Sequence, residues 1–166
     1  MRFPGAVDSK FTSAISFEQP STYPAIQTYR AMSPDGDIIS PTVTPPSDSE
    51  ALTLYENMVA VSIMDVIMFD AQRQGRLSFY MTSQGEEGTC VGSASALEKE
   101  DVIFSQYREA GVFMQRGYKF TDFMSQLFAN NKDSGRGRNM PVHYGSKELN
   151  IVSNSSYPYM DILTLS

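Results

Sequence analysis

Arg108 is the residue of this chain whose type and position best suit chemistry. It follows the apolar run 102–105, which predicts a short buried strand, and precedes the apolar run 112–114, which indicates a helix. Ligands of α/β sheets bind at the carboxyl ends of strands, where this loop would lie, and a guanidinium there can hold a phosphate through two parallel hydrogen bonds. The alternative is a salt bridge with an acidic neighbour such as Glu109 or Asp101, and the residues alone leave both interpretations open.

The loop 130–145 holds most of the other candidates. Arg136 and Arg138 lie between glycines and could bind an anion or simply lie in solvent. His143 is the single histidine, and we expect it to be solvated or structurally hydrogen-bonded. Cys90 is expected to be a small buried residue and not a nucleophile. The sequence has no Cys/His metal cluster, Walker loop or Gly-x-Ser-x-Gly elbow, so metal-site and simple hydrolase functions lack their usual support.

The composition indicates one soluble globular domain and excludes disordered, collagen-like and coiled-coil proteins, because 41% of the 166 residues are hydrophobic and 19% are charged. The formal net charge of -6 predicts no general attraction to nucleic acid or to an anionic membrane. The longest apolar stretch, 59–69, is interrupted by Ser62 and Asp65 and is shorter than the roughly 18 apolar residues of a membrane span. One cysteine forms no internal disulfide, so a reducing compartment is the simpler expectation.

The elements that must position these residues begin after residue 48. Residues 1–48 hold seven of the nine prolines and are expected to form an extended arm, with a small hairpin at the Pro-Asp-Gly turn 34–36. Ser47 and Glu50 then have the spacing of a capping box, and no proline or glycine follows until Gly75, which predicts one long helix. The second half of this helix is apolar nearly all round, so we expect several neighbours to bury it.

A second helix is predicted from Ser83 and Glu86, which repeat the capping-box spacing, to about Leu97. Small residues recur at three- and four-residue spacing on one of its faces: Gly85, Gly88, Thr89, Gly92, Ser93 and Ala96. Each glycine costs about 1 kcal/mol of helix propensity relative to alanine, so a close contact should offset the loss. That contact is either a tight helix crossing inside the core or an interface with a cofactor or another subunit.

The C-terminal part of the chain predicts one more helix and one more strand. The helix runs from Thr121 through Ala129, and a strand begins at 151–152. The inward face of that helix is predicted to be apolar: Phe120, Phe123, Met124, Leu127 and Phe128. The fold class is therefore α/β, with a long buried helix and a small-residue helix packed on an incomplete parallel sheet.

Four sequence motifs make the chain similar to a known family. They are RQGRLSFYM at 73–81, GEEGT at 85–89, QYREAG at 106–111 and RNMPVHYG at 138–145. In order and spacing they resemble the alpha subunits of mitochondrial branched-chain 2-oxo acid dehydrogenases. The resemblance covers roughly residues 3–156. It implies that residues 49–156 are the N-terminal part of a thiamine-diphosphate-binding domain.

The resemblance also implies an activity and partners. Such enzymes are heterotetramers of two alpha and two beta subunits with the cofactor between unlike chains. They carry out oxidative decarboxylation of branched-chain 2-oxo acids and transfer the acyl group to lipoyl groups on an acyltransferase core. The implied location is the mitochondrial matrix, although residues 1–10 show no transit-peptide pattern.

The resemblance assigns roles to four residues. Tyr107 and Arg108 match positions that contact the diphosphate end of thiamine diphosphate, Ser156 matches a serine at the cofactor, and Ser155 matches a ligand of a structural K⁺. Residues 157–166 depart from the family pattern, which would continue to the Mg²⁺ site. We therefore expect a truncated chain with an incomplete Mg²⁺ and K⁺ site that is inactive alone. The alternatives are a non-catalytic module that binds the beta subunit or a full-length alpha subunit, and an unrelated anion-binding domain.

Overall fold

The computed structural model describes residues 12–153, and the chain divides into two compact units, Met1–Pro45 and Pro46–Ser166. In the first unit, the described residues contain a short 3-10 helix, η1 (Pro20–Thr22), and are mostly exposed. The predicted hairpin is confirmed as a single antiparallel bridge between Met32 and Ile38, and Gly36 takes the positive φ of 94° that its turn requires. The predicted extended arm over residues 1–48 stays a prediction.

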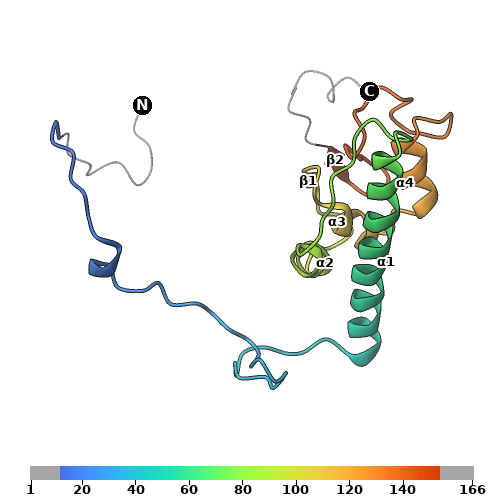
Figure 1. Ribbon diagram of the computed structural model, residues 1–166. Coiled ribbons are helices and arrows are strands. Elements are labelled where there is room, and N and C mark those ends of the chain that lie inside the picture. Colours follow the sequence, from blue (N-terminus) through green and yellow to red (C-terminus); the bar gives the residue numbers. More distant parts are fainter. Residues whose placement is uncertain (1–11, 154–166) are drawn as a thin grey trace. The chain divides into compact units, whose positions relative to one another are not determined.

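The second unit begins with α1 (Asp48–Arg73), the predicted long helix. Ser47 caps it as expected: its side chain accepts from the backbone N–H of Glu50, and its own N–H donates to the Glu50 carboxylate at 2.8 Å. The helix ends before Gly75, whose φ of 74° lies in the left-handed region. Figure 1 shows that the first half of α1 extends past the other elements of this unit.

One face of α1 packs against the rest of the unit through Val61, Met64, Asp65 and Met68. The described residues bury the second half of α1 on one side only, and its expected burial against several neighbours stays a prediction. Four large apolar side chains of that half remain exposed: Ile63, Val66, Ile67 and Phe69. The reason is that the described elements cover only one side of the helix. α1 is also long and apolar enough to cross a membrane, with a mean hydropathy of 1.5, a test that core helices of soluble proteins also meet.

α2 (Glu87–Ser95) is shorter than predicted and has no capping box. It packs through Cys90, Val91 and Ala94, while its glycines face outward: a Cβ at Gly92 would meet no atom within 4 Å. The prediction that these glycines allow a tight crossing inside the core is therefore wrong. The close approach lies on the neighbouring helix, where a Cβ at Gly111 would lie 2.9 Å from the Cβ of Cys90. The alternative, an interface at the small-residue face, stays a prediction.

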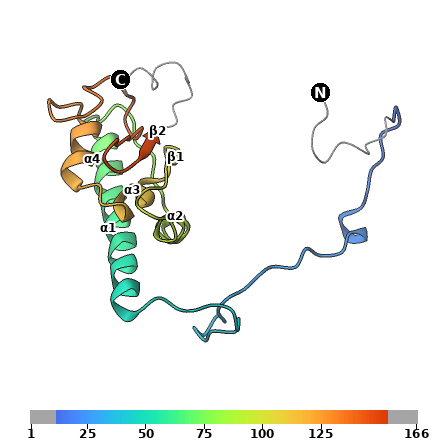
Figure 2. The same ribbon diagram turned by 180° about the vertical axis from the view of Figure 1, so that it is seen from behind.

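Two predicted strands form a parallel pair. β1 (Ile103–Ser105) and β2 (Ile151–Ser153) pair in register, Ile103 with Ile151 and Ser105 with Ser153. Between them in the chain lie α3 (Ala110–Gln115) and α4 (Phe120–Leu127). The described second unit is thus a small α/β fold with two parallel strands, as the sequence predicts. Figures 1 and 2 show α4 on one side of α1 and α2 and α3 on the other.

The core of this unit is rich in aromatic side chains. Phe113, Tyr118, Phe123 and Tyr144 are buried and meet edge to face or tilted, with ring centroids 4.8 to 6.0 Å apart. α4 contributes Phe123 and Leu127 to the core as predicted. Phe120 and Phe128, also predicted to face inward, are about half exposed because they lie at the two ends of the helix. Ala110 and Phe113 of α3, the helix that follows the loop after β1, belong to the same core.

Candidate functional site

Tyr107 and Arg108 lie on the loop between β1 and α3, at the carboxyl end of β1, as the sequence predicts. The Arg108 guanidinium carbon lies 5.8 Å from the centroid of the Tyr107 ring, within the range of a cation–π contact. The Tyr107 residue is 39% exposed and the Arg108 side chain 45% exposed. The two side chains therefore form an accessible pair with one positive charge.

The backbone of Arg108 is held from inside the protein. The buried hydroxyl of Ser83 donates to the Arg108 carbonyl oxygen at 2.9 Å. The Cys90 thiol points to the same carbonyl at 3.8 Å, the longer distance of a weak sulfur donor. Burial raises the pKa of Cys90 to about 11, in agreement with its predicted role as a small buried residue. The exposed guanidinium thus extends from a fixed main chain.

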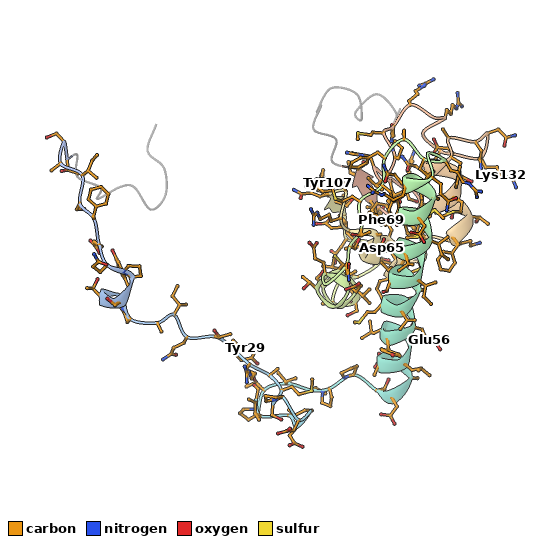
Figure 3. All side chains as sticks on the ribbon, viewed as in Figure 1. Tyr29, Glu56, Asp65, Phe69, Tyr107 and Lys132 are labelled. Atoms are coloured by element: carbon orange, nitrogen blue, oxygen red, sulfur yellow. The ribbon has the colours of Figure 1, made fainter. Side chains whose placement is uncertain are left out.

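Asp65 anchors this arrangement from α1. Its carboxylate, only 3% exposed, accepts from the Tyr80 hydroxyl at 2.7 Å and from the Ser83 N–H at 2.5 Å. Burial raises the pKa of Asp65, and the two hydrogen bonds partly offset that rise because they favour the charged form. Hydrogen bonds therefore connect α1 through Ser83 to the Arg108 backbone. Figure 3 marks Asp65 on α1 and Tyr107 on the loop after β1.

Sequence reasoning missed this role of Asp65 and misassigned Ser83. Asp65 counted only as an interruption of an apolar stretch, although a lone carboxylate in such a helix is the available signal of a buried polar contact. Ser83 has the right spacing for a cap, but its N–H and hydroxyl are already used by Asp65 and Arg108. The first turn of α2 is capped at Glu86 with no side-chain hydrogen bond.

The salt-bridge interpretation of Arg108 is realised with a different partner. Its guanidinium lies 3.5 Å from the Glu86 carboxylate, and both side chains are 45% exposed. Glu109 and Asp101, the predicted partners, instead accept from backbone N–H groups of Gln106 and Glu98. An exposed ion pair of this kind contributes about 0 to 1 kcal/mol, so it does not prevent Arg108 from binding an anion.

The structure brings His143 to this site. Its ring centroid lies 6.5 Å from that of Tyr107, and its Nδ1 lies 3.1 Å from the Pro141 carbonyl oxygen, so it is structurally hydrogen-bonded as expected. Arg136 and Arg138 are exposed on a turn organised by Asp133, whose carboxylate accepts two backbone N–H groups. Both of their predicted roles, anion binding and solvation, stay open.

The remaining predicted site residues are two serines after β2. Ser155 and Ser156 lie outside the described residues, and they follow the last residue of β2, Ser153, by two and three positions. Within residues 12–153, no group of three or more His, Cys, Asp and Glu side chains could hold a metal ion. The exposed guanidinium of Arg108 gives the described part of the site a positive charge, which suits an anion.

Comparison with known proteins gives one family match, to the dehydrogenase E1 component, over residues 55–159. The chain belongs to this family. Members of the dehydrogenase E1 family generally use thiamine diphosphate, and the matched residues include the whole Tyr107–Arg108 loop and its anchors Asp65 and Ser83. The predicted resemblance is confirmed.

Curated relatives of this dehydrogenase E1 chain carry a more specific name. The proteins named "2-oxoisovalerate dehydrogenase subunit alpha, mitochondrial" from Mus musculus and Homo sapiens are each 49% identical over 156 residues, which is 93% of this chain and 35% of the relative. The protein of that name from Caenorhabditis elegans is 46% identical over 93% of this chain and 36% of its own length. The chain thus spans about a third of the length of these relatives.

Proposed function

We propose that this chain supplies part of the thiamine-diphosphate site of a branched-chain 2-oxo acid dehydrogenase. The reaction is oxidative decarboxylation of a branched-chain 2-oxo acid, followed by acyl transfer to a lipoyl group of the complex. The proposal extends to this chain the activity that the names of its relatives indicate. The observation that carries it is the half-exposed guanidinium of Arg108 on a backbone fixed by Ser83 at the carboxyl end of β1.

In this function, Tyr107 and Arg108 bind the diphosphate end of the cofactor. The fixed backbone lets Arg108 present two parallel N–H donors without ordering a flexible loop first. Thiamine diphosphate, when bound, supplies the nucleophilic carbanion and the electron sink for decarboxylation. Ser156 at the cofactor and Ser155 at K⁺ stay proposals, as does Mg²⁺, which commonly binds through one or two carboxylates together with the phosphates of its ligand.

Partners are part of the same proposal. We propose association with a beta subunit, a second alpha subunit and a lipoyl-bearing acyltransferase core in the mitochondrial matrix. An apolar groove of about 610 Å³ between α1 and α4, lined by side chains such as Tyr55, Ile63 and Phe120, supports burial against another chain. Neither nucleic acid nor a membrane is among the proposed partners.

The test is a cofactor titration of the chain co-expressed with a branched-chain dehydrogenase beta subunit. Arg108→Lys should weaken thiamine diphosphate binding by roughly tenfold or more, since an ammonium cannot copy the bidentate guanidinium. Glu86→Gln is the matched control, because it removes the other half of the ion pair and one competing negative charge. It should leave the affinity unchanged or slightly higher. Equal losses in both variants would mean that the ion pair is structural and that Arg108 does not bind the diphosphate.

A second candidate function is a non-catalytic binding module, which the outward-facing glycines of α2 favour. In this function the chain binds a beta subunit or a full-length alpha subunit through its small-residue face. Gly92→Leu should then abolish co-purification with the partner, while the chain should stay folded because a Cβ at this position meets no atom within 4 Å. Co-purification without any 2-oxo acid turnover would favour the module, and turnover would favour the enzyme.

A further inference from the structure

Gln126 on α4 is a buried glutamine whose two amide ends both bind backbone of one turn. Its Nε2 donates to the Met140 carbonyl oxygen at 2.7 Å, and its Oε1 accepts from the Val142 N–H at 3.1 Å. The side chain is only 3% exposed. A carbonyl can only accept and an N–H can only donate, so these two partners fix which end of the amide is oxygen. Gln126 therefore bridges the turn over residues 140–142.

That turn has a backbone conformation that its sequence does not favour. Val142 has a φ of 67°, in the left-handed region, where a β-branched residue is a rare outlier. Its side chain is buried, so the core holds it on one side while Gln126 holds its N–H on the other. Such conformations persist only when the surrounding structure enforces them, and they cluster at binding and catalytic sites.

The consequence of this turn is the placement of His143. Its Nδ1 can only donate to the Pro141 carbonyl oxygen, 3.1 Å away, so the proton of a neutral ring lies on Nδ1. No residue in the described part of the chain hydrogen-bonds Nε2. The ring lies beside Tyr107, with 6.5 Å between centroids.

We propose that Gln126 is a positioning residue of the candidate site: it enforces the turn at Val142 and so holds His143 beside Tyr107, where Nε2 makes a hydrogen bond to the bound cofactor. This inference rests on the proposed function, because the ligand is the thiamine diphosphate that Tyr107 and Arg108 bind. It adds a residue from α4 and one from the loop before β2 to a site otherwise built from the loop after β1.

The first experiment measures the imidazole nitrogens of the ¹⁵N-labelled chain by NMR, where the single histidine gives one unambiguous set of signals. Wild type should show the Nδ1-protonated form. Gln126→Met, which keeps the length but removes both hydrogen bonds, should shift His143 toward the Nε2-protonated form that free histidine favours. Gln115→Met is the matched control, since it removes a hydrogen bond to Asn57 away from this turn and should leave the signals unchanged. A wild-type chain with its proton on Nε2 overturns the inference even if Gln126→Met does not fold.

The second experiment measures thiamine diphosphate affinity by calorimetry in the chain co-expressed with a beta subunit. Gln126→Met and His143→Ala should each lower the affinity for thiamine diphosphate by roughly tenfold, the effect of about one hydrogen bond. The double variant should lose no more affinity than either single variant. Additive losses would show that Gln126 does not act through His143. If wild type binds thiamine diphosphate and neither variant weakens binding, the inference about Gln126 and His143 is overturned while the proposed function stands. No binding by wild type contradicts the proposed function and, with it, the cofactor contact of His143.

Discussion

The hydrogen-bonded carboxylate of Asp65 gives the sharpest stability prediction. Asp65→Ala removes the acceptor of two donors that are themselves buried, the Tyr80 hydroxyl and the Ser83 N–H. Neither donor can turn to solvent without moving the segment that also holds the Arg108 carbonyl. The variant should therefore lose stability well beyond an ordinary substitution on a helix surface.

The magnitude follows from the two donors left without partners. Each buried unsatisfied donor costs about 1 to 3 kcal/mol, and the relief of a buried charge offsets part of the sum. We expect a net loss of about 3 kcal/mol, a large share of the 5 to 15 kcal/mol of a typical domain. Asp65→Asn keeps one acceptor oxygen and should lose about half as much. Asp70→Ala, an exposed carboxylate on the same helix, should change stability by at most about 0.5 kcal/mol.

The assay is urea unfolding of the chain followed by far-UV circular dichroism, with the free energy of unfolding extrapolated to water. The expected order of stability is wild type and Asp70→Ala together, then Asp65→Asn, then Asp65→Ala. If Asp65→Ala unfolds without urea, Asp65→Asn supplies the measurable value. An Asp65→Ala free energy of unfolding within about 1 kcal/mol of the Asp70→Ala value would refute the reasoning, because it would mean that water or other groups satisfy both donors.

Two further stability predictions follow from the same unit. Because burial raises the pKa of Asp65, the folded state binds a proton at this carboxyl more tightly than the unfolded state does. The difference in free energy of unfolding between wild type and Asp65→Ala should therefore grow as the pH falls from 7 to 4.5. A smaller difference at pH 4.5 would contradict this sign. Gly111→Ala should lower the free energy of unfolding by about 1 to 3 kcal/mol because the new Cβ lies 2.9 Å from the Cβ of Cys90. Gly92→Ala, whose Cβ meets nothing within 4 Å, should raise it by about 0.5 to 1 kcal/mol through helix propensity. Equal effects of the two variants in urea unfolding would contradict this packing.

Local sequence signals predict the elements of this fold well. Ser47 and Glu50 cap α1 through contacts three residues apart, and Gly75 ends it, so both signals act within one turn of helix. The strands β1 and β2 are also visible in the sequence because apolar runs between polar segments mark them. Arg108 follows β1 as predicted, because the position of a loop depends only on where its strand ends.

Contacts between distant segments could not be predicted in the same way. The spacing of Ser83 suits a cap, but Asp65, a residue of another helix, takes its N–H. The spacing of the glycines correctly predicts that they share one face of α2, but spacing does not show whether other parts of the chain cover that face. Gln126 looks like any polar residue of an amphipathic helix until the turn at residues 140–142 is placed against it. The partner of Arg108, Glu86, was likewise set by how α2 packs.

The parallel pairing of β1 with β2 has a consequence for how the chain folds. Ile103 pairs with Ile151 across a long stretch of chain that contains α3, α4 and the arginine-bearing loop after α4. Each strand has only three residues, so few backbone hydrogen bonds offset the entropy lost when this long segment closes into a loop. The helices should therefore form first and the strand pair last. Amide hydrogens of the pair, such as the Ile103 N–H that donates to Asn150, should exchange with solvent sooner than those in the middle of α1, although both lie in one compact unit.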